Sequence, residues 1–166
     1  MQHYSEKFCD FKKSVTGSLA IVSKKVANKK LWGFANEQGE EVIPCKYDKV
    51  AVFGFLNGYA PVLKGEFCGI INEQGVEVVP CEYDHVNLFS EGLAGVEKNG
   101  LWGFSNEFGE VFIPCQYEAI SSRGFFEGYI PVMLKGLWGV INTKGELVIP
   151  CEYEDEFQVP LSPTMK

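Results

Sequence analysis

The sequence predicts an all-β protein in which three-stranded antiparallel units follow one another as tandem repeats. One stretch, LWGFSNEFGEVFIPCQY at 101–117, returns in altered form at 31–47, 67–83 and 137–153. One proline per copy keeps a regular spacing of 36, 34 and 36 residues, at Pro44, Pro80, Pro114 and Pro150. The apolar segments of each copy are short, rich in Val, Ile, Phe, Tyr and Trp, and separated by Gly or Asn, which is typical of strands. Each copy is therefore one supersecondary unit of a repeat protein.

The first two strands of a unit form a predicted hairpin. The first strand is expected at 93–98, and Asn99-Gly100 follows it. Because both residues tolerate positive φ, this dipeptide favours a two-residue type I′ turn. The second strand is expected at 101–105, and each of the three repeat tryptophans precedes a glycine. That position in a central strand favours a buried tryptophan over one that stacks on a sugar or a base.

The second turn of a unit is predicted at 106–109. Asn106 can accept hydrogen bonds from backbone N–H groups that follow it, and Gly109 can adopt the left-handed conformation, so we expect a type I turn with a G1 bulge. The third strand is expected at 110–117. Pro114 has no N–H to donate, so it should mark a bulge or the point where the strand leaves the sheet. The apolar residues before Pro114 point to both faces of the sheet. A single unit cannot bury both faces, so neighbouring units must pack against it.

The recurring pattern is specific enough to suggest a family. Each copy follows one pattern: Trp-Gly-Phe/Val-x-Asn-x-x-Gly, then Glu-x-Val-Ile-Pro-x-x-Tyr, then Phe-x-x-Gly-x-x-x-Val. Over residues 17–154 this pattern resembles the WG-repeat (KWG) family of bacterial β-repeats. The resemblance implies all-β modules that serve as interaction surfaces and have no family active-site residues. Two features depart from the pattern. Cys68 replaces the tryptophan of the second copy, and the last unit ends after Tyr153 without its Gly-x-x-x-Val strand.

The strand at 19–24 is surplus at one end of the chain, and its equivalent is missing at the other. Two arrangements are compatible with this. The units could stack as an open solenoid-like array that begins and ends mid-unit, or they could form a closed four-bladed propeller-like ring in which the N-terminal half-repeat completes the last unit. The number of repeats varies widely within the WG-repeat family that the chain resembles, and each three-stranded unit is short. Both features favour the open array.

The domain boundaries follow from the repeats. Residues 1–16 are predicted to be an N-terminal cap or tether, residues 17–157 a single β-repeat domain, and residues 158–166 a C-terminal tail. Within the domain we expect a half-repeat at 17–31 and repeats at 32–67, 68–101, 102–137 and 138–157.

The net charge of -7 is unevenly distributed along the chain. Residues 1–31 carry seven lysines against two acidic residues, whereas residues 32–166 carry eight basic and twenty acidic side chains. An acidic body repels nucleic acid and favours a basic protein as partner. No apolar run approaches the roughly 20 residues of a membrane span, and the first residues hold no signal-peptide core, so we expect a cytoplasmic protein without a membrane partner.

The cysteines are expected to be buried thiols. Four of them occupy the same position in successive repeats: Cys45, Cys81, Cys115 and Cys151. Their spacing therefore follows from the repeat and is not evidence of disulfide pairing. No two cysteines are spaced as C-x-x-C, and His3 and His85 lie in no ligand pattern, so neither a metal nor a cofactor is predicted.

No catalytic residues are predicted. An acidic residue follows the tyrosine of every unit, and its repetition favours a turn or capping role over general acid chemistry: Asp48, Asp84, Glu118 and Glu154. His85 could act as a base near Cys81 or Cys68, but no third group is in place to orient it. We therefore do not expect an enzyme.

Two connections are longer than the third, and insertions in repeat arrays often lie on the binding face. Phe55, Phe89 and Phe125 share a repeat position and are expected in the core. The surplus residues of the longer connections give three candidate partner-binding residues: Phe53, Phe126 and Arg123. An extra phenylalanine that fills a gap between units is the competing interpretation.

The sequence thus predicts a non-enzymatic β-repeat scaffold that mediates protein–protein interaction and binds or inhibits a basic partner protein. The alternative is a small-ligand or glycan-binding module that uses aromatic residues between repeats.

Overall fold

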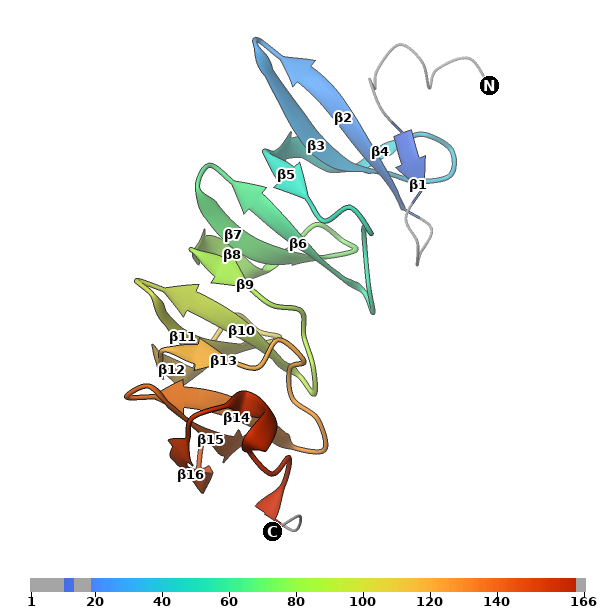
Figure 1. The fold of residues 1–166 in the computed structure, drawn as a ribbon. Coiled ribbons are helices and arrows are strands. Elements are labelled where there is room, and N and C mark those ends of the chain that lie inside the picture. Colours follow the sequence, from blue (N-terminus) through green and yellow to red (C-terminus); the bar gives the residue numbers. More distant parts are fainter. Residues whose placement is uncertain (1–10, 14–18, 164–166) are drawn as a thin grey trace. The chain divides into compact units, whose positions relative to one another are not determined.

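The computed structural model describes residues 11–13 and 19–163, and these form four four-stranded antiparallel sheets (Figure 1). The strands are β1 (Phe11–Lys13), β2 (Ala20–Val26), β3 (Lys29–Ala35), β4 (Glu41–Tyr47), β5 (Lys49–Val50), β6 (Tyr59–Lys64), β7 (Phe67–Asn72), β8 (Glu77–Tyr83), β9 (His85–Val86), β10 (Leu93–Lys98), β11 (Leu101–Asn106), β12 (Val111–Tyr117), β13 (Ala119–Ile120), β14 (Tyr129–Leu134), β15 (Leu137–Asn142) and β16 (Leu147–Tyr153). One 3-10 helix, η1 (Glu156–Gln158), follows them. The chain divides into two compact units, of which the first ends at Glu82 and the second begins at Tyr83. The predicted all-β class is confirmed.

All four sheets have the same strand order. In the third sheet β9, β10, β11 and β12 are successive antiparallel neighbours, and the other sheets repeat this sequence. The first sheet corrects one expectation, because β2 is not a surplus strand. It pairs with β3 along its whole length and with β1 on its other edge. The last sheet has its own equivalent, β14. The N-terminal half-repeat therefore completes the first sheet and not the last.

The fourth strand of each sheet is short and was not predicted. The two-residue strands β5, β9 and β13 follow the tyrosine of the preceding repeat and pair with the next Gly-x-x-x-Val strand. In the first sheet β1 takes this place beside β2, so Phe11–Lys13, which lie in the predicted cap or tether, belong to a sheet. The rest of residues 1–16 lies outside the described residues.

The structure confirms both predicted turn types. Asn99 and Gly100 have φ values of 55° and 79°, as a type I′ turn between β10 and β11 requires. In the following turn the Asn106 Oδ1 atom accepts the N–H groups of Phe108 and Glu110 at 3.0 Å each. Gly109 donates its N–H to the Asn106 carbonyl oxygen and has a φ of 79°. The same side-chain bonds recur at Asn36, Asn72 and Asn142.

The glycine that follows each repeat tryptophan is explained by the predicted bulge at the proline. Gly103 of β11 alone lies opposite residues 114–116 of β12, because the register shifts there. A Cβ atom on Gly103 would lie 2.4 Å from the Ile113 carbonyl oxygen and 2.6 Å from the Cys115 amide nitrogen. Only glycine therefore fits where the bulged strand crosses its neighbour.

Each unit has a core between its two sheets. In the first unit the rings of Phe34, from β3, and Phe55, from the connection to β6, lie 4.7 Å apart. In the second unit Phe104 and Phe125 lie 5.0 Å apart in the same relationship. Phe55 and Phe125 are buried as predicted, whereas Phe89 is half-buried.

The tryptophans correct a further expectation. Trp32, Trp102 and Trp138 pack against buried clusters but are themselves half-buried. In the first unit the Lys30 ammonium nitrogen lies 4.7 Å from the centroid of the Trp32 ring. The tryptophans therefore border the core and do not form its centre.

The C-terminal segment is not a free tail. Val159 is buried and packs with Val140 and Ile149 of the last sheet. Ser162 is also buried. Residues 158–163, predicted as tail, thus cover one face of the fourth sheet (Figure 1).

Five cysteines, Cys45, Cys68, Cys81, Cys115 and Cys151, are present as thiols, and Cys9 lies outside the described residues. Among the residues that the structure describes, no helix is long and apolar enough to cross a membrane.

Candidate functional site

The three candidate residues lie in two equivalent loops, one in each unit. Arg123 and Phe126 belong to the loop between β13 and β14, whereas Phe53 lies between β5 and β6 in the first unit. Phe53 and Arg123 occupy the same loop position, since each precedes a glycine with positive φ, 72° at Gly54 and 74° at Gly124. Phe53 is half-buried and Arg123 is exposed. The structure therefore brings Arg123 and Phe126 together and leaves Phe53 in the other unit.

Hydrogen bonds from the preceding connection hold the Arg123 loop in place. The Ser90 hydroxyl oxygen accepts the Phe125 N–H at 2.8 Å, and the Glu91 Oε2 atom accepts the Gly128 N–H at 2.8 Å. With Phe125 buried, the next residue, Phe126, points outward and is 62% exposed. The loop thus presents an aromatic ring to solvent from a fixed backbone.

The C-terminal segment forms the opposite side of the site. Asp155 caps η1, because its carboxylate accepts the Phe157 N–H at 3.0 Å. This turn projects Phe157 into solvent with 80% of its surface exposed, while Val159 anchors the segment on the sheet. The Arg123 guanidinium carbon lies 5.8 Å from the centroid of the Phe157 ring, within cation–π range.

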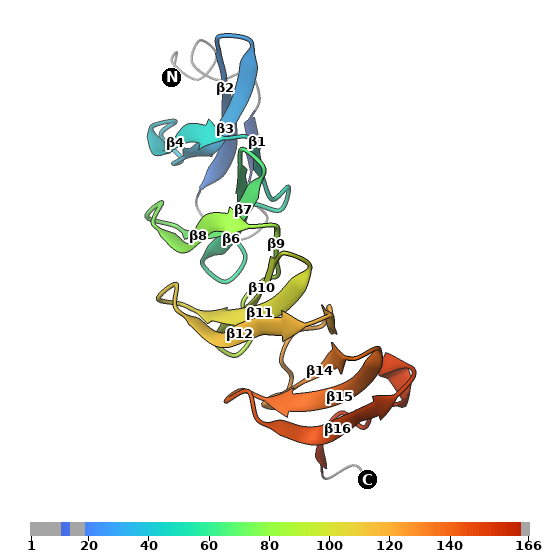
Figure 2. The same cartoon turned by 90° about the vertical axis from the view of Figure 1, so that its left-hand side faces the viewer.

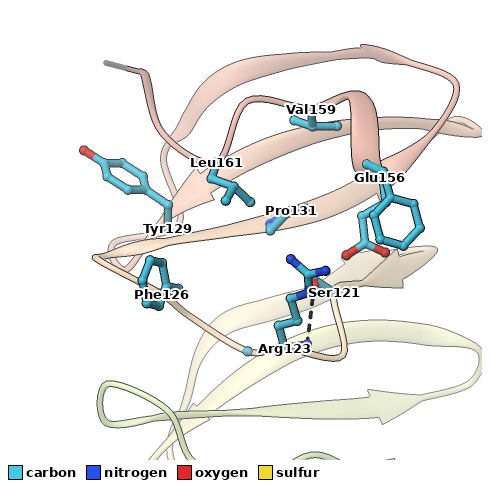
Figure 3. A pocket seen from close by; sticks show the side chains of 10 residues that line it. Ser121, Arg123, Phe126, Tyr129, Pro131, Glu156, Val159 and Leu161 are labelled. Atoms are coloured by element: carbon cyan, nitrogen blue, oxygen red, sulfur yellow. Dashed lines mark hydrogen bonds between the residues drawn. The ribbon is translucent and has the colours of Figure 1, made fainter. Parts of the chain in front are cut away.

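A cavity of about 140 Å³ lies between the loop and the C-terminal segment (Figure 3). Pro131 and Val159, both shielded from solvent, line its inner part, and Tyr129 lies at one end. Its rim carries Arg123, Glu156 and the exposed aromatic and aliphatic side chains Phe126, Phe157 and Leu161. Such a pocket can hold an apolar side chain while the two charged groups orient the polar part of the same ligand.

A second cavity, of about 320 Å³, lies in the first unit beside Trp32. Ile21, Val50 and Val52 give it apolar walls, and Asp48 and Lys49 add one charge of each sign. Asp48 is paired with Lys29 and accepts the Gly65 N–H at 2.7 Å. These bonds lower the pKa of the Asp48 carboxyl, the Lys29 ammonium group being the larger cause.

The acidic residues after the tyrosines have the structural role predicted for them. Like Asp48, Asp84 accepts a turn N–H, that of Asn99, at 2.8 Å, and Glu118 accepts that of Gly136 at 2.9 Å. Each bond ties the end of one repeat to the hairpin turn of the next.

The residues weighed for catalysis do not form a reactive cluster. His85 Nε2 lies 3.6 Å from a carboxylate oxygen of Glu97 on the neighbouring strand β10. Burial, followed by the nearby Glu77 carboxylate, raises the pKa of the Cys81 thiol to about 11, which suppresses its nucleophilic thiolate. Among the described residues no group of three His, Cys, Asp or Glu side chains is placed to hold a metal ion.

Comparison with known proteins identifies the repeats. The family model for "WG containing repeat" matches residues 32–66, 69–102, 102–138 and 138–155. The chain belongs to the WG-repeat family. No curated protein matches the chain. A solved structure described as "KlHsv2 with loop 6CD replaced by a Gly-Ser linker" is 12% identical, with a TM-score of 0.42 over 85% of this chain and 50% of that one. A likeness this low implies nothing about arrangement or function.

Phe126 is not a surplus residue of its connection, contrary to the prediction, and Phe157 was not predicted as a site residue. Leu56 and Ser90 are the equivalents of Phe126 in the other two connections, because each of the three residues forms a β-bridge with the residue three positions later in the chain. Phe157 follows the last WG repeat, and no repeat equivalent draws attention to it. Its contact with Arg123 depends on how the C-terminal segment folds back, and no local pattern encodes that contact.

Proposed function

We propose that this WG-repeat chain is a non-enzymatic protein-interaction module and that the Arg123 loop and the C-terminal segment form its binding site. One observation carries this: Phe126 and Phe157 are 62% and 80% exposed on either side of a preformed cavity with an apolar inner wall. Exposed aromatic rings and an arginine around a pocket are the composition of interface hot spots.

The size of the cavity favours a side chain of a partner protein over a free ligand. Pockets for small molecules usually measure roughly 300 to 1,000 Å³. The cavity of about 140 Å³ is smaller than this. It suits one apolar side chain of a partner, whose neighbouring residues would cover the rings of Phe126 and Phe157.

The charge of the chain supports a basic partner. The excess of acidic side chains in residues 32–166 attracts a positively charged protein over long range and raises its association rate. Inhibition of that partner is one form that such binding could take. We place this interaction in the cytoplasm, and fractionation of the source cell tests the location.

A small-ligand or glycan-binding module is the second candidate, and the cavity beside Trp32 favours it. Its volume of about 320 Å³ lies within the range of ligand sites, and the half-buried tryptophan offers a ring for stacking. Thermal shift measurements with a panel of sugars and nucleotides separate the two candidates. A rise in melting temperature that Trp32→Ala abolishes would favour the ligand function.

Affinity capture from the source cell tests the protein-binding function. The wild-type chain should retain a partner that the Phe126→Ser variant loses. Serine is the natural residue at the equivalent position, Ser90, so this variant is compatible with the loop. Leu56→Ser changes the equivalent position of the first unit and is the matched control. Equal capture by all three chains would contradict the assigned site.

We also propose that the four sheets form an open array. Each sheet already contains its own Gly-x-x-x-Val strand, which leaves none to be shared in closing a ring. Small-angle X-ray scattering distinguishes the two arrangements, because an open array has a larger maximum dimension than a ring of four sheets.

A further inference from the structure

Further exposed apolar side chains lie on the turn that joins β11 to β12 and at the start of β12. Figure 2 shows the course of the backbone in these two strands and their turn. Phe108 is 85% exposed, Phe112 54% and Val111 46%. We call these three residues the Phe108 patch. None of them lines the cavity at Arg123. The patch is thus separate from the binding site proposed above.

The other repeats show that the fold does not need these aromatic rings. The place of Phe108 is taken by Gln38 and Gln74 in the first two repeats and by Lys144 in the fourth. The turns are otherwise alike: the Asn side chain accepts the N–H of Gln38 at 3.0 Å, as it does that of Phe108. Phe112 likewise replaces a valine of the other repeats. Because glutamine and valine serve the same turn geometry, the two phenylalanines are available for another role.

Two carboxylates lie on the same turn as Phe108. Glu107 and Glu110 are exposed on the same turn, and the Glu110 Oε2 atom accepts a hydrogen bond from the Asn106 side chain at 2.9 Å, which fixes that carboxylate beside the rings. Negative charge next to exposed aromatic rings disfavours nucleic acid and anionic membranes.

The turn of the fourth repeat packs against β12. Its Gly145 lies against β12, since a Cβ atom there would be 3.2 Å from the Ile113 Cγ1 atom. This turn adds the exposed side chains of Lys144, Glu146 and Leu147. Together the two turns carry three exposed carboxylates and one exposed ammonium group: Glu107, Glu110, Glu146 and Lys144.

We propose that the Phe108 patch binds a basic segment of a partner protein. An apolar side chain of that segment packs on Phe108 and Phe112, and flanking lysine or arginine residues pair with Glu107 and Glu110. This inference rests on the proposed function, because it assumes that the partner is a protein. The residues of the Phe108 patch are different from those of the Arg123 site.

The test uses the full chain labelled with ¹⁵N and a capped synthetic peptide, Lys-Arg-Leu-Lys-Arg, as probe. Amide signals of residues 106–112 should shift at peptide concentrations of about 1 mM or below. The double variant Phe108→Gln, Phe112→Val, which restores the residues of the other repeats, should bind about tenfold more weakly. The charge-reversed peptide Glu-Asp-Leu-Glu-Asp should cause no shifts there.

Phe126→Ser is the matched control and should leave peptide binding unchanged. This control separates the two sites. If Phe126→Ser loses partner capture but still binds the peptide, both site assignments stand. If Phe126→Ser keeps both partner capture and peptide binding, only the assignment of the Arg123 site is contradicted. No shifts at residues 106–112, equal binding by the double variant, or equal binding of the acidic peptide would overturn the assignment of the Phe108 patch.

Discussion

The Asp84 carboxylate accepts the backbone N–H of Asn99 at 2.8 Å, so the end of one WG repeat holds the hairpin turn of the next. Asp48 and Glu118 make the same contact with the following turns, at Gly65 and Gly136. The acidic residue after each tyrosine is therefore a repeated structural joint. Part of the negative charge of this chain therefore belongs to the fold.

The Asp48 joint predicts a pH dependence of stability. Its pKa is lowered by Lys29 and by the Gly65 N–H, so the folded state favours the ionised carboxylate. A lowered folded pKa contributes stability above the unfolded pKa of about 3.9, and this stability is lost as the pH falls through the folded value. Asp48→Asn should be less stable than wild type at pH 7, and the difference should shrink below about pH 4.

Urea unfolding of both proteins between pH 7 and pH 3 measures this difference. Glu66→Gln is the control, because it removes an exposed carboxylate from the turn that Asp48 holds. Its free energy of unfolding should depend on pH in the same way as that of the wild type. A difference between Asp48→Asn and wild type that stays constant over the whole range would show that ionisation of Asp48 does not stabilise the joint.

The glycine after the tryptophan should tolerate no side chain. Gly103→Ala should destabilise the protein by about 3 kcal/mol, because the new Cβ would overlap backbone atoms of the bulged strand. Gly100→Asn is the control: no atom lies within 4 Å of the added Cβ, and asparagine tolerates the positive φ there, so the loss should stay below about 1 kcal/mol. Chemical denaturation gives both values, and similar losses would refute the steric explanation.

Cys81 should be a slow nucleophile in the folded protein. With its pKa raised to about 11 from the ordinary value of 9.0, the thiolate fraction at neutral pH falls by about a hundredfold. Alkylation by iodoacetamide, followed by mass spectrometry of the Cys81 peptide, should be much slower in buffer than in urea. Equal rates under the two conditions would mean that the thiol is not held in the buried environment.

Val159 should anchor the C-terminal segment. Val159→Ala removes buried apolar surface next to Val140 and Ile149 and should cost about 1 to 3 kcal/mol. Val52→Ala, at a residue that is 83% exposed, should be nearly neutral. Urea unfolding compares them. A neutral result for Val159→Ala would indicate that residues 158–163 form the free tail that the sequence suggests.

The parts of the fold that the sequence predicts are those encoded by local chemistry. Asn99-Gly100 sets its turn through positive φ, Asn106 and Gly109 set the next one, and Pro114 marks the bulge; each needs only a few neighbouring residues. The two-residue strands and the packing of Val159 depend on contacts between distant segments. Their short sequences carry no periodicity that distinguishes them from loops.

The candidate site was predictable in part for the same reason. Arg123 stands out as a surplus residue in a longer connection, whereas Phe126 has the equivalents Leu56 and Ser90 in the other connections. The structure places Arg123 and Phe126 at one cavity. Phe53 has the same sequence signal but is half-buried in the first unit. Phe157 completes the site through tertiary contact alone. Phe108 could have been found from the sequence, because glutamine takes its place in two other repeats.

The affinity of the captured partner for Phe126→Ser and Phe157→Ser tests the central claim most directly. Both side chains are exposed, so neither variant should change the melting temperature. If the Arg123 cavity is the binding site, each variant should raise the dissociation constant at least about tenfold, a loss of about 1.4 kcal/mol, while Leu56→Ser binds like wild type. Unchanged affinity in both variants, or a lower melting temperature with unchanged affinity, would show that these rings cover the fold and do not bind the partner.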